Sequence, residues 1–182
     1  MTRREILKTL LLFGAQTLLP FPDTDVEASP SKRLYTGKIS LYSEHSAEYL
    51  SVQYLNKNNG HLDKEAWRQL NHFFRCHHDG RIHPIHPMLF LLLDIVRCQL
   101  KAKERPYCLF SGYRSPAYNQ MLCCEDAKVA HHSYHLKGMA ADITLEGVSQ
   151  RDILKVVKRL RLGGVGRYQD FVHLDVGPWR TW

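Results

Sequence analysis

The stretch Ser133-Tyr134-His135-Leu136-Lys137-Gly138-Met139-Ala140-Ala141-Asp142 decides how this sequence of 182 residues is interpreted. His135 and Asp142 are seven residues apart, across a glycine. Residues 141–145 alternate in the way typical of a strand, so Asp142 is expected at the start of that strand and His135 in the loop before it. In this arrangement both side chains face one point.

A second candidate strand, Phe171-Val172-His173-Leu174-Asp175, supplies a third residue of the same chemical kind. Strand side chains alternate, so His173 and Asp175 are expected on one face. His135, Asp142 and His173 together make a set of two imidazoles and one carboxylate, which zinc favours. Three protein ligands leave a fourth position for water, as in catalytic zinc sites. A single histidine on a strand is more often a core residue, so the prediction depends on all three.

An arginine follows a third candidate strand. The apolar stretch 107–110 runs directly into Ser111-Gly112-Tyr113-Arg114-Ser115. Loops at strand ends often display polar side chains to ligands, and a guanidinium group binds a carboxylate or an oxyanion at two points. A ligand-binding role and an ordinary surface position for Arg114 are both open at this stage.

The pattern of strands and helices along the rest of the chain predicts one domain over residues 38–182 that contains both. Alternation predicts a hairpin from residues 39–42 and 49–55. Apolar periodicity predicts helices that begin after Asp63, near Pro87 and after Ser149. The glycine-rich segment 163–166 fits the end of a helix and a tight turn into a strand better than a nucleotide-binding loop.

Composition limits the possible partners. The chain is 44% hydrophobic and 24% charged, which suits a packed domain and excludes disorder and collagen-like repeats. Its formal net charge of +7 suits an anionic partner such as nucleic acid, an acidic membrane surface or a cell-wall polymer. The sequence contains no helix-turn-helix or aromatic nucleic-acid motif, so nucleic acid is not expected as a partner.

The first 28 residues are typical of an export signal. Arg3-Arg4 precedes the apolar run 9–20, which is too short for the roughly 20 residues of a membrane span. The paired arginines resemble a twin-arginine signal, which predicts export to the periplasm and no transmembrane segment after cleavage. Removing residues 1–28, with three basic and four acidic side chains, leaves a net charge of +8, and residues 29–37 form a linker. The alternative is a cytosolic protein with an amphipathic first helix.

We do not predict a metal site from the cysteines or from the clustered histidines. The five cysteines form no Cys-x-x-Cys pair, and we expect mostly buried, unpaired thiols, although an oxidising compartment would allow up to two disulfides. Four histidines between two candidate helices follow no ligand spacing and are expected at the solvated surface. These are His77, His78, His83 and His86.

Four motifs in order resemble one family. They are Ser111–Ser115, Ser133–Asp142, Gly163–Gly166 and Phe171–Trp182, and the resemblance covers roughly residues 38–182. They are similar to the MepK-like murein endopeptidases of the LAS group of zinc peptidases, which includes D-Ala-D-Ala metallopeptidases, lysostaphin-like enzymes and the hedgehog signalling domain. The resemblance implies an α+β fold, with helices packed on a small, largely antiparallel sheet that carries a zinc site.

The same resemblance implies the chemistry. Zn²⁺ would be held by His135, Asp142 and His173, and the substrate would be the cross-linked stem peptides of bacterial peptidoglycan. Arg114 would hold a substrate carboxylate or the oxyanion. A non-catalytic, zinc-containing module that binds the cell wall is the alternative, and the type of cross-link and the oligomeric state are left open.

Two carboxylates are candidates for the general base. Asp170 lies three residues before His173, where many members of the group carry Glu. Asp175 is the favoured candidate because it shares a strand face with His173. The His-x-His segment of other members is absent, since Phe171 occupies its first position.

Overall fold

The computed structural model describes residues 34–56, 58–127 and 129–182. The predicted signal at 1–28 lies outside the described residues, as does most of the predicted linker. Within the described residues, no helix combines the length and the apolar character needed to cross a bilayer.

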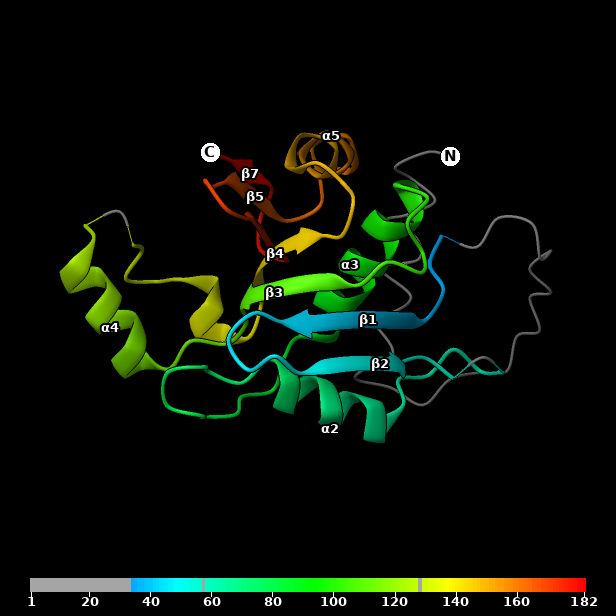
Figure 1. Ribbon diagram of the computed structural model, residues 1–182, viewed down its shortest axis with the longest axis horizontal. Coiled ribbons are helices and arrows are strands. Elements are labelled where there is room, and N and C mark those ends of the chain that lie inside the picture. The colour runs from blue at the N-terminus through cyan, green and yellow to red at the C-terminus, as the bar shows by residue number, and fades with distance from the viewer. Residues whose placement is uncertain (1–33, 57, 128) are drawn as a thin grey trace.

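A seven-stranded sheet organises the domain (Figure 1). Its strand order is β2-β1-β3-β4-β6-β5-β7, and all neighbours are antiparallel except the β1–β3 and β5–β7 pairs. The expected α+β class with a largely antiparallel sheet is confirmed. The strands are β1 (Lys38–Ser43), β2 (Tyr49–Gln53), β3 (Tyr107–Ser111), β4 (Ala140–Leu145), β5 (Gly164–Arg167), β6 (Val172–Asp175) and β7 (Arg180–Thr181).

Among the described residues, four α-helices accompany the sheet: α2 (Lys64–Phe73), α3 (Pro87–Gln99), α4 (Pro116–Glu125) and α5 (Gln150–Leu160). The predicted caps explain where α2 and α5 begin. The Asp63 side chain accepts a hydrogen bond from the backbone N–H of Ala66, and the Ser149 side chain accepts one from Asp152. Pro87 is the first residue of α3, where its missing N–H costs nothing.

The two faces of the sheet differ in burial. Alternate residues such as Leu41, Leu109 and Ile143 are buried, and they join one apolar core with side chains of α2, α3 and α5. Their neighbours along the strands, such as Tyr42 and Cys108, are exposed or half-buried. One face therefore carries the core. The opposite face is accessible at Tyr42, Cys108 and Thr144, whereas its residues nearest the β4–β6 pairing, such as Asp142 and Asp175, are buried.

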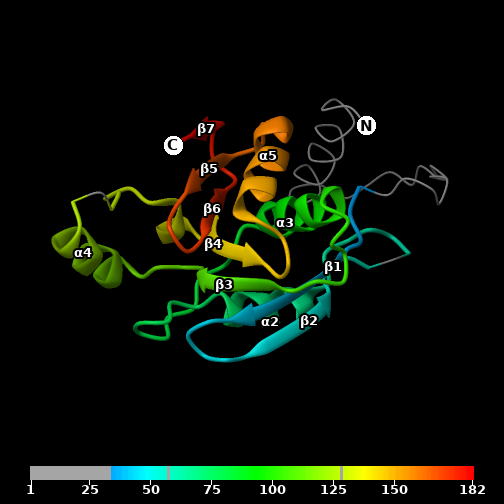
Figure 2. The ribbon, with the colours of Figure 1, turned by 45° about the horizontal axis from the view of Figure 1, so that its top comes forward.

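Helix α4 was not predicted from the sequence. Both ribbon views show it apart from the sheet, at one end of the domain (Figures 1 and 2). Asn119 is its only buried residue, so no apolar stripe signals it. The available signal was its start, where Ser115 accepts a hydrogen bond from Tyr118 N–H and Pro116 occupies the first turn.

The expectation for the cysteines is only half right. All five are free, but only Cys76 is buried. Cys124 is exposed and Cys123 is half-buried because both lie on α4, which packs little against the core. The prediction of mostly buried thiols is therefore wrong.

Candidate metal centre

Three side chains from three elements converge at the centre. His135 comes from a short 3₁₀ helix, η2 (Tyr134–Lys137), Asp142 from β4 and His173 from β6. Asp142 Oδ1 lies 3.2 Å from His135 Nε2 and 2.8 Å from His173 Nδ1, and these two nitrogens are 3.2 Å apart. All three residues are buried. The structure thus brings together the three residues that the sequence predicted as ligands.

Local sequence explains how His135 reaches the centre. Ser133 caps η2 by accepting a hydrogen bond from the backbone N–H of His135. Gly138 ends the short helix at φ +62°, a left-handed conformation that favours glycine. A Cβ at position 138 would lie 2.5 Å from the carbonyl oxygen of Pro84, so glycine is also required for close packing. His135 was expected in a loop and instead lies on this single helical turn.

Outer hydrogen bonds set the orientation of both imidazoles. His135 Nδ1 lies 2.6 Å from the carbonyl oxygen of Gly112, and His173 Nε2 lies 3.0 Å from Asp175 Oδ2. A ring nitrogen that donates to such an oxygen leaves the lone pair of the other nitrogen free. His135 Nε2 and His173 Nδ1 therefore both present a lone pair to the centre.

The carboxylate of Asp142 is oriented in the same way. Arg114 Nη2 donates to Asp142 Oδ2 at 2.5 Å, while Arg114 Nε donates to Ser111 Oγ at 3.0 Å. Oδ1 is left to face the two imidazole nitrogens. Two nitrogens and one oxygen, each with an outer partner, match the donor set and support that zinc sites use. The residues present therefore fit a metal ion.

The electrostatics favour the metal-binding protonation states of His135 and Asp142. Burial lowers the pKa of His135, which keeps its imidazole neutral. Burial alone would raise the pKa of Asp142, but charge interactions and hydrogen bonds with His135 and His173 hold it well below its usual range. A neutral imidazole and an ionised carboxylate are the forms that bind metal. Burial alone would lower the pKa of His173, but its hydrogen bonds with Asp142 and Asp175 raise it, so a metal ion must displace a proton there.

Asp175 lies behind His173 as seen from the centre. Its Oδ1 accepts hydrogen bonds from Gly164 N–H, Gly177 N–H and Arg180 Nη1 at 3.1, 2.8 and 3.0 Å. Its Oδ2 accepts from His173 Nε2 at 3.0 Å and from Arg180 Nη2 at 2.7 Å. The side chain is fully buried, and although burial alone would raise the pKa of Asp175, these hydrogen bonds lower it to about 2.

Asp175 shares a face with His173 as expected, but the imidazole ring stands between it and the centre. This geometry favours a positioning role over the expected role of general base.

Asp170 occupies a different environment. It lies in the turn between β5 and β6 and is exposed. The hydrogen bonds of the described residues do not involve its carboxylate. The structure does not place Asp170 within the His135, Asp142 and His173 cluster.

Sequence reasoning missed three contributors to the site. The Gly112 carbonyl oxygen lies 2.6 Å from His135 Nδ1, and Arg180 donates to Asp175, which in turn orients His173. The ring centroid of the Trp182 indole lies 5.2 Å from that of His173. Arg180 and Trp182 stand in the motif 171–182, but residue type and spacing gave no sign of their roles. Backbone carbonyls carry no sequence signal at all.

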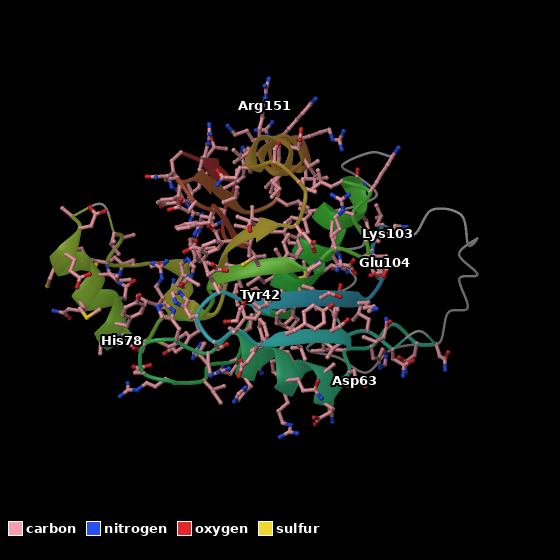
Figure 3. All side chains as sticks on the ribbon, viewed as in Figure 1. Tyr42, Asp63, His78, Lys103, Glu104 and Arg151 are labelled. Carbon is pink, nitrogen blue, oxygen red and sulfur yellow. The ribbon has the colours of Figure 1, made fainter. Side chains whose placement is uncertain are left out.

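The histidines between α2 and α3 do not build a second centre. His77 and His78 are exposed, as expected, and both rings pack against Tyr118 of α4. His78 is labelled in Figure 3. His83 stacks on Tyr113. Among the described residues, His135, Asp142 and His173 form the only group of three or more candidate ligands close enough to share a metal ion.

A mixed α+β domain that carries a buried His-Asp-His group with oriented ligand atoms has the framework of a metallopeptidase. The chain belongs to the peptidoglycan L,D-endopeptidase MepK family of M15-type peptidases, whose model matches residues 31–182. This finding confirms the resemblance that the sequence motifs indicated.

Two known relatives are similar to this chain over nearly its whole length, and a third is similar over about two thirds of it. The chain is 36% identical over 183 aligned residues to the peptidoglycan L,D-endopeptidase MepK of Escherichia coli (strain K12), covering 99% of this chain and 96% of the relative. The protein of the same description from Shigella flexneri gives the same values. A probable peptidoglycan L,D-endopeptidase MepK from Haemophilus influenzae is 33% identical over 117 residues, 63% of each chain. No solved structure matches the chain significantly.

Proposed function

We propose that this protein is a zinc-dependent endopeptidase that hydrolyses L,D peptide cross-links of peptidoglycan. One observation carries the proposal: three ligand atoms converge at the centre, and the outer atom of each ligand side chain is held by a hydrogen bond. Two imidazoles and one carboxylate favour zinc over harder cations. Family membership supplies the substrate class. Because the family consists of L,D-endopeptidases, it favours the bridge between two diaminopimelyl residues over the D-alanyl bridge.

Zinc bound by His135, Asp142 and His173 would supply Lewis-acid polarisation of the scissile carbonyl and acidify a water molecule. The chain's own residues keep the ligands in place. The Gly112 carbonyl orients His135, and the Asp175 carboxylate, itself held by Arg180, orients His173. Preoriented ligands spare the site from reorganising during the reaction.

Proton transfer is assigned to Asp170 in this proposal. Asp175 has both oxygens engaged by five hydrogen bonds, so it lacks an accessible lone pair for a proton from water. Asp170 is exposed and stands three residues before His173, at the position where the wider group commonly carries an acid. The proposal requires the turn before β6 to bring this carboxylate to the substrate.

Arg114 has two roles in the proposal. Its Nε and Nη2 groups hold Ser111 and Asp142, which fixes the ligand carboxylate. Its remaining Nη1 group is assigned to a substrate carboxylate or to the developing oxyanion, since a guanidinium group can serve two acceptors at once.

The proposal includes a location. Export to the periplasm through the twin-arginine route is supported by Arg3-Arg4 and the short apolar run that follows. Peptidoglycan lies in that compartment, and the basic composition of the chain suits its free carboxylates. Replacing both arginines by lysine is expected to leave the protein in the cytosol.

Purified protein incubated with isolated peptidoglycan, with and without a zinc chelator, tests the proposal. Release of L,D-cleaved fragments that stops with chelator and returns with added zinc is the expected result. Binding to peptidoglycan without release of fragments would support the non-catalytic module instead. Separate assays on purified muropeptide dimers with L,D and D,D cross-links check the bond specificity.

A further inference from the structure

The accessible face of the sheet leads to the metal centre. Strand register places Tyr42 of β1 beside Cys108 of β3, and Cys108 beside Thr144 of β4. Two residues before Thr144 along β4, on the same face, stands Asp142, which pairs with His173 of β6. A molecule lying across this face would therefore reach the ligand cluster.

Aromatic side chains form a connected row on this side of the domain. The Phe110 and Phe171 ring centroids are 5.8 Å apart, and Phe171 stacks on Tyr168 at 4.8 Å. Trp182 Nε1 donates to the Tyr168 hydroxyl at 3.2 Å, and the indole ring contacts His173. We call this set, together with Tyr42, the aromatic face; its members are Tyr42, Phe110, Tyr168, Phe171 and Trp182.

Three members of the aromatic face are exposed, and Phe110 and Phe171 are half-buried. Trp182 is 51% exposed, Tyr168 43% and Tyr42 38%. Tyr42 is labelled on the sheet in Figure 3. Exposed apolar surface of this kind beside a reactive centre marks a binding site more often than a chance arrangement.

The exposed rings are also held in place. A Cβ at position 166 would lie 2.3 Å from the Trp182 indole, so Gly166 lets the ring lie directly against β5. The Arg180 guanidinium carbon lies 5.1 Å from the indole centroid, and the Trp182 backbone N–H donates to the Val165 carbonyl oxygen at 3.3 Å. A ring fixed on one side and exposed on the other loses little entropy when a ligand packs on it.

We infer that the aromatic face binds the amino sugars of the glycan strand to which the substrate peptides are attached. This inference rests on the proposed function. The C–H groups of a pyranose ring carry slight positive charge and pack well on the negative face of an aromatic ring. The muramic acid carboxyl is amidated by the stem peptide, so the glycan backbone is neutral, as are the five aromatic side chains. The more flexible and charged stem peptide suits the polar centre instead.

The dimensions agree with this assignment. Three stem residues separate the sugar from a bond between two diaminopimelyl residues, and at 3.3–3.6 Å per residue they span about 10 Å. The row begins with Trp182, 5.2 Å from the His173 ring, and continues through three further rings. A sugar on the outer rings therefore leaves enough length for its stem peptide to reach the ligand cluster.

Direct binding of uncharged N-acetylglucosamine oligomers to the full zinc-loaded chain tests the inference without a need for turnover, because peptide-free strands of the natural glycan would expose a muramic acid carboxylate in every repeat. Calorimetric titration is expected to show saturable binding that Tyr168→Ala weakens about tenfold and Tyr168→Phe weakens much less. Ile82→Ala is the matched control, because Ile82 is 57% exposed but lies in the loop before α3, outside the aromatic face. A thermal melt of each variant checks that it is folded.

A second measurement compares kcat/KM on cross-linked peptide dimers with and without their disaccharides. The wild-type chain is expected to prefer the sugar-bearing dimer, and the ratio of the two values is expected to fall about tenfold in Tyr168→Ala and to stay constant in Ile82→Ala. Hydrolysis without glycan binding would overturn this inference alone. Glycan binding without hydrolysis would overturn the proposed function and leave the inference standing. A third outcome is that the wild-type chain binds no glycan and forms a dimer in solution, and that Tyr168→Ala is monomeric. This outcome would make the aromatic face an interface between copies and would overturn the inference.

Discussion

His173 donates from Nε2 to Asp175 Oδ2 over 3.0 Å, and this one bond determines which of its nitrogens faces the ligand cluster. With Nε2 occupied, Nδ1 is the nitrogen that approaches Asp142 Oδ1 and His135 Nε2. Asp175 is held in turn by Arg180 at both oxygens. The relationship gives Asp175 a function that is distinct from proton transfer and can be tested separately.

Asp175→Asn is expected to weaken zinc binding. The substitution removes the charge that supports His173 and leaves Arg180 with a poorer partner, and loss of such outer support typically costs about 10- to 100-fold in metal affinity. Competition with a chromogenic chelator measures the zinc Kd directly. If the zinc Kd is unchanged while kcat falls by more than about a hundredfold, Asp175 is the general base after all.

Asp170→Asn should show the opposite pattern. Asp170 lies outside the ligand cluster, so zinc content should stay near one ion per chain while kcat falls by about 10² to 10⁴. Metal analysis and turnover of an L,D-cross-linked dimer are measured on the same preparation. Glu104→Gln is the control, since Glu104 is an exposed carboxylate in the loop between α3 and β3 and is outside the ligand cluster. Glu104 is labelled in Figure 3. Full activity of Asp170→Asn would remove Asp170 from the mechanism.

Substitutions at Arg114 separate its two proposed roles. Arg114→Ala removes the hydrogen bonds to Ser111 Oγ and Asp142 Oδ2, so zinc affinity is expected to fall about tenfold. Arg114→Lys keeps the charge but not the planar two-point contact, and an intermediate loss is expected. A higher KM with an unaltered zinc Kd would mean that Arg114 contacts only the substrate.

The cysteines should differ in their rate of modification. Cys124 is exposed on α4 and is expected to react first with an alkylating reagent, whereas Cys76 is buried and should react last. Burial raises the pKa of the Cys98 and Cys108 thiols to about 12, which keeps the reactive thiolate scarce. Mass spectrometry of the folded protein follows the order, and denaturation without reductant should release all five thiols. A disulfide found in the untreated protein would contradict this expectation.

Sequence alone predicted the elements whose patterns are local. The caps at Asp63 and Ser149, the alternation of β4 and β6, and the seven-residue spacing of His135 and Asp142 all follow from short-range rules. These rules identified the three residues. The structure adds that β4 and β6 pair so that Asp142 lies opposite His173.

The remaining features depend on long-range contacts. Strand alternation correctly placed Asp175 on the same face as His173. It does not reveal that the imidazole ring separates the Asp175 carboxylate from the centre, or that Arg180 donates to that carboxylate. Helix α4 lacks an apolar stripe and packs little against the core, so periodicity gave no sign of it. The same absence of packing explains why Cys124 is exposed.

The most direct test of the account is the zinc content of the purified full chain and its His135→Ala variant, measured together with peptidoglycan hydrolysis. His135, Asp142 and His173 each supply one of three ligand atoms, so removing one bond should not be compensated by the other two. The account predicts one zinc ion per wild-type chain and loss of both zinc and hydrolysis in His135→Ala, with the variant still folded. Full zinc content and full hydrolysis in His135→Ala would contradict it.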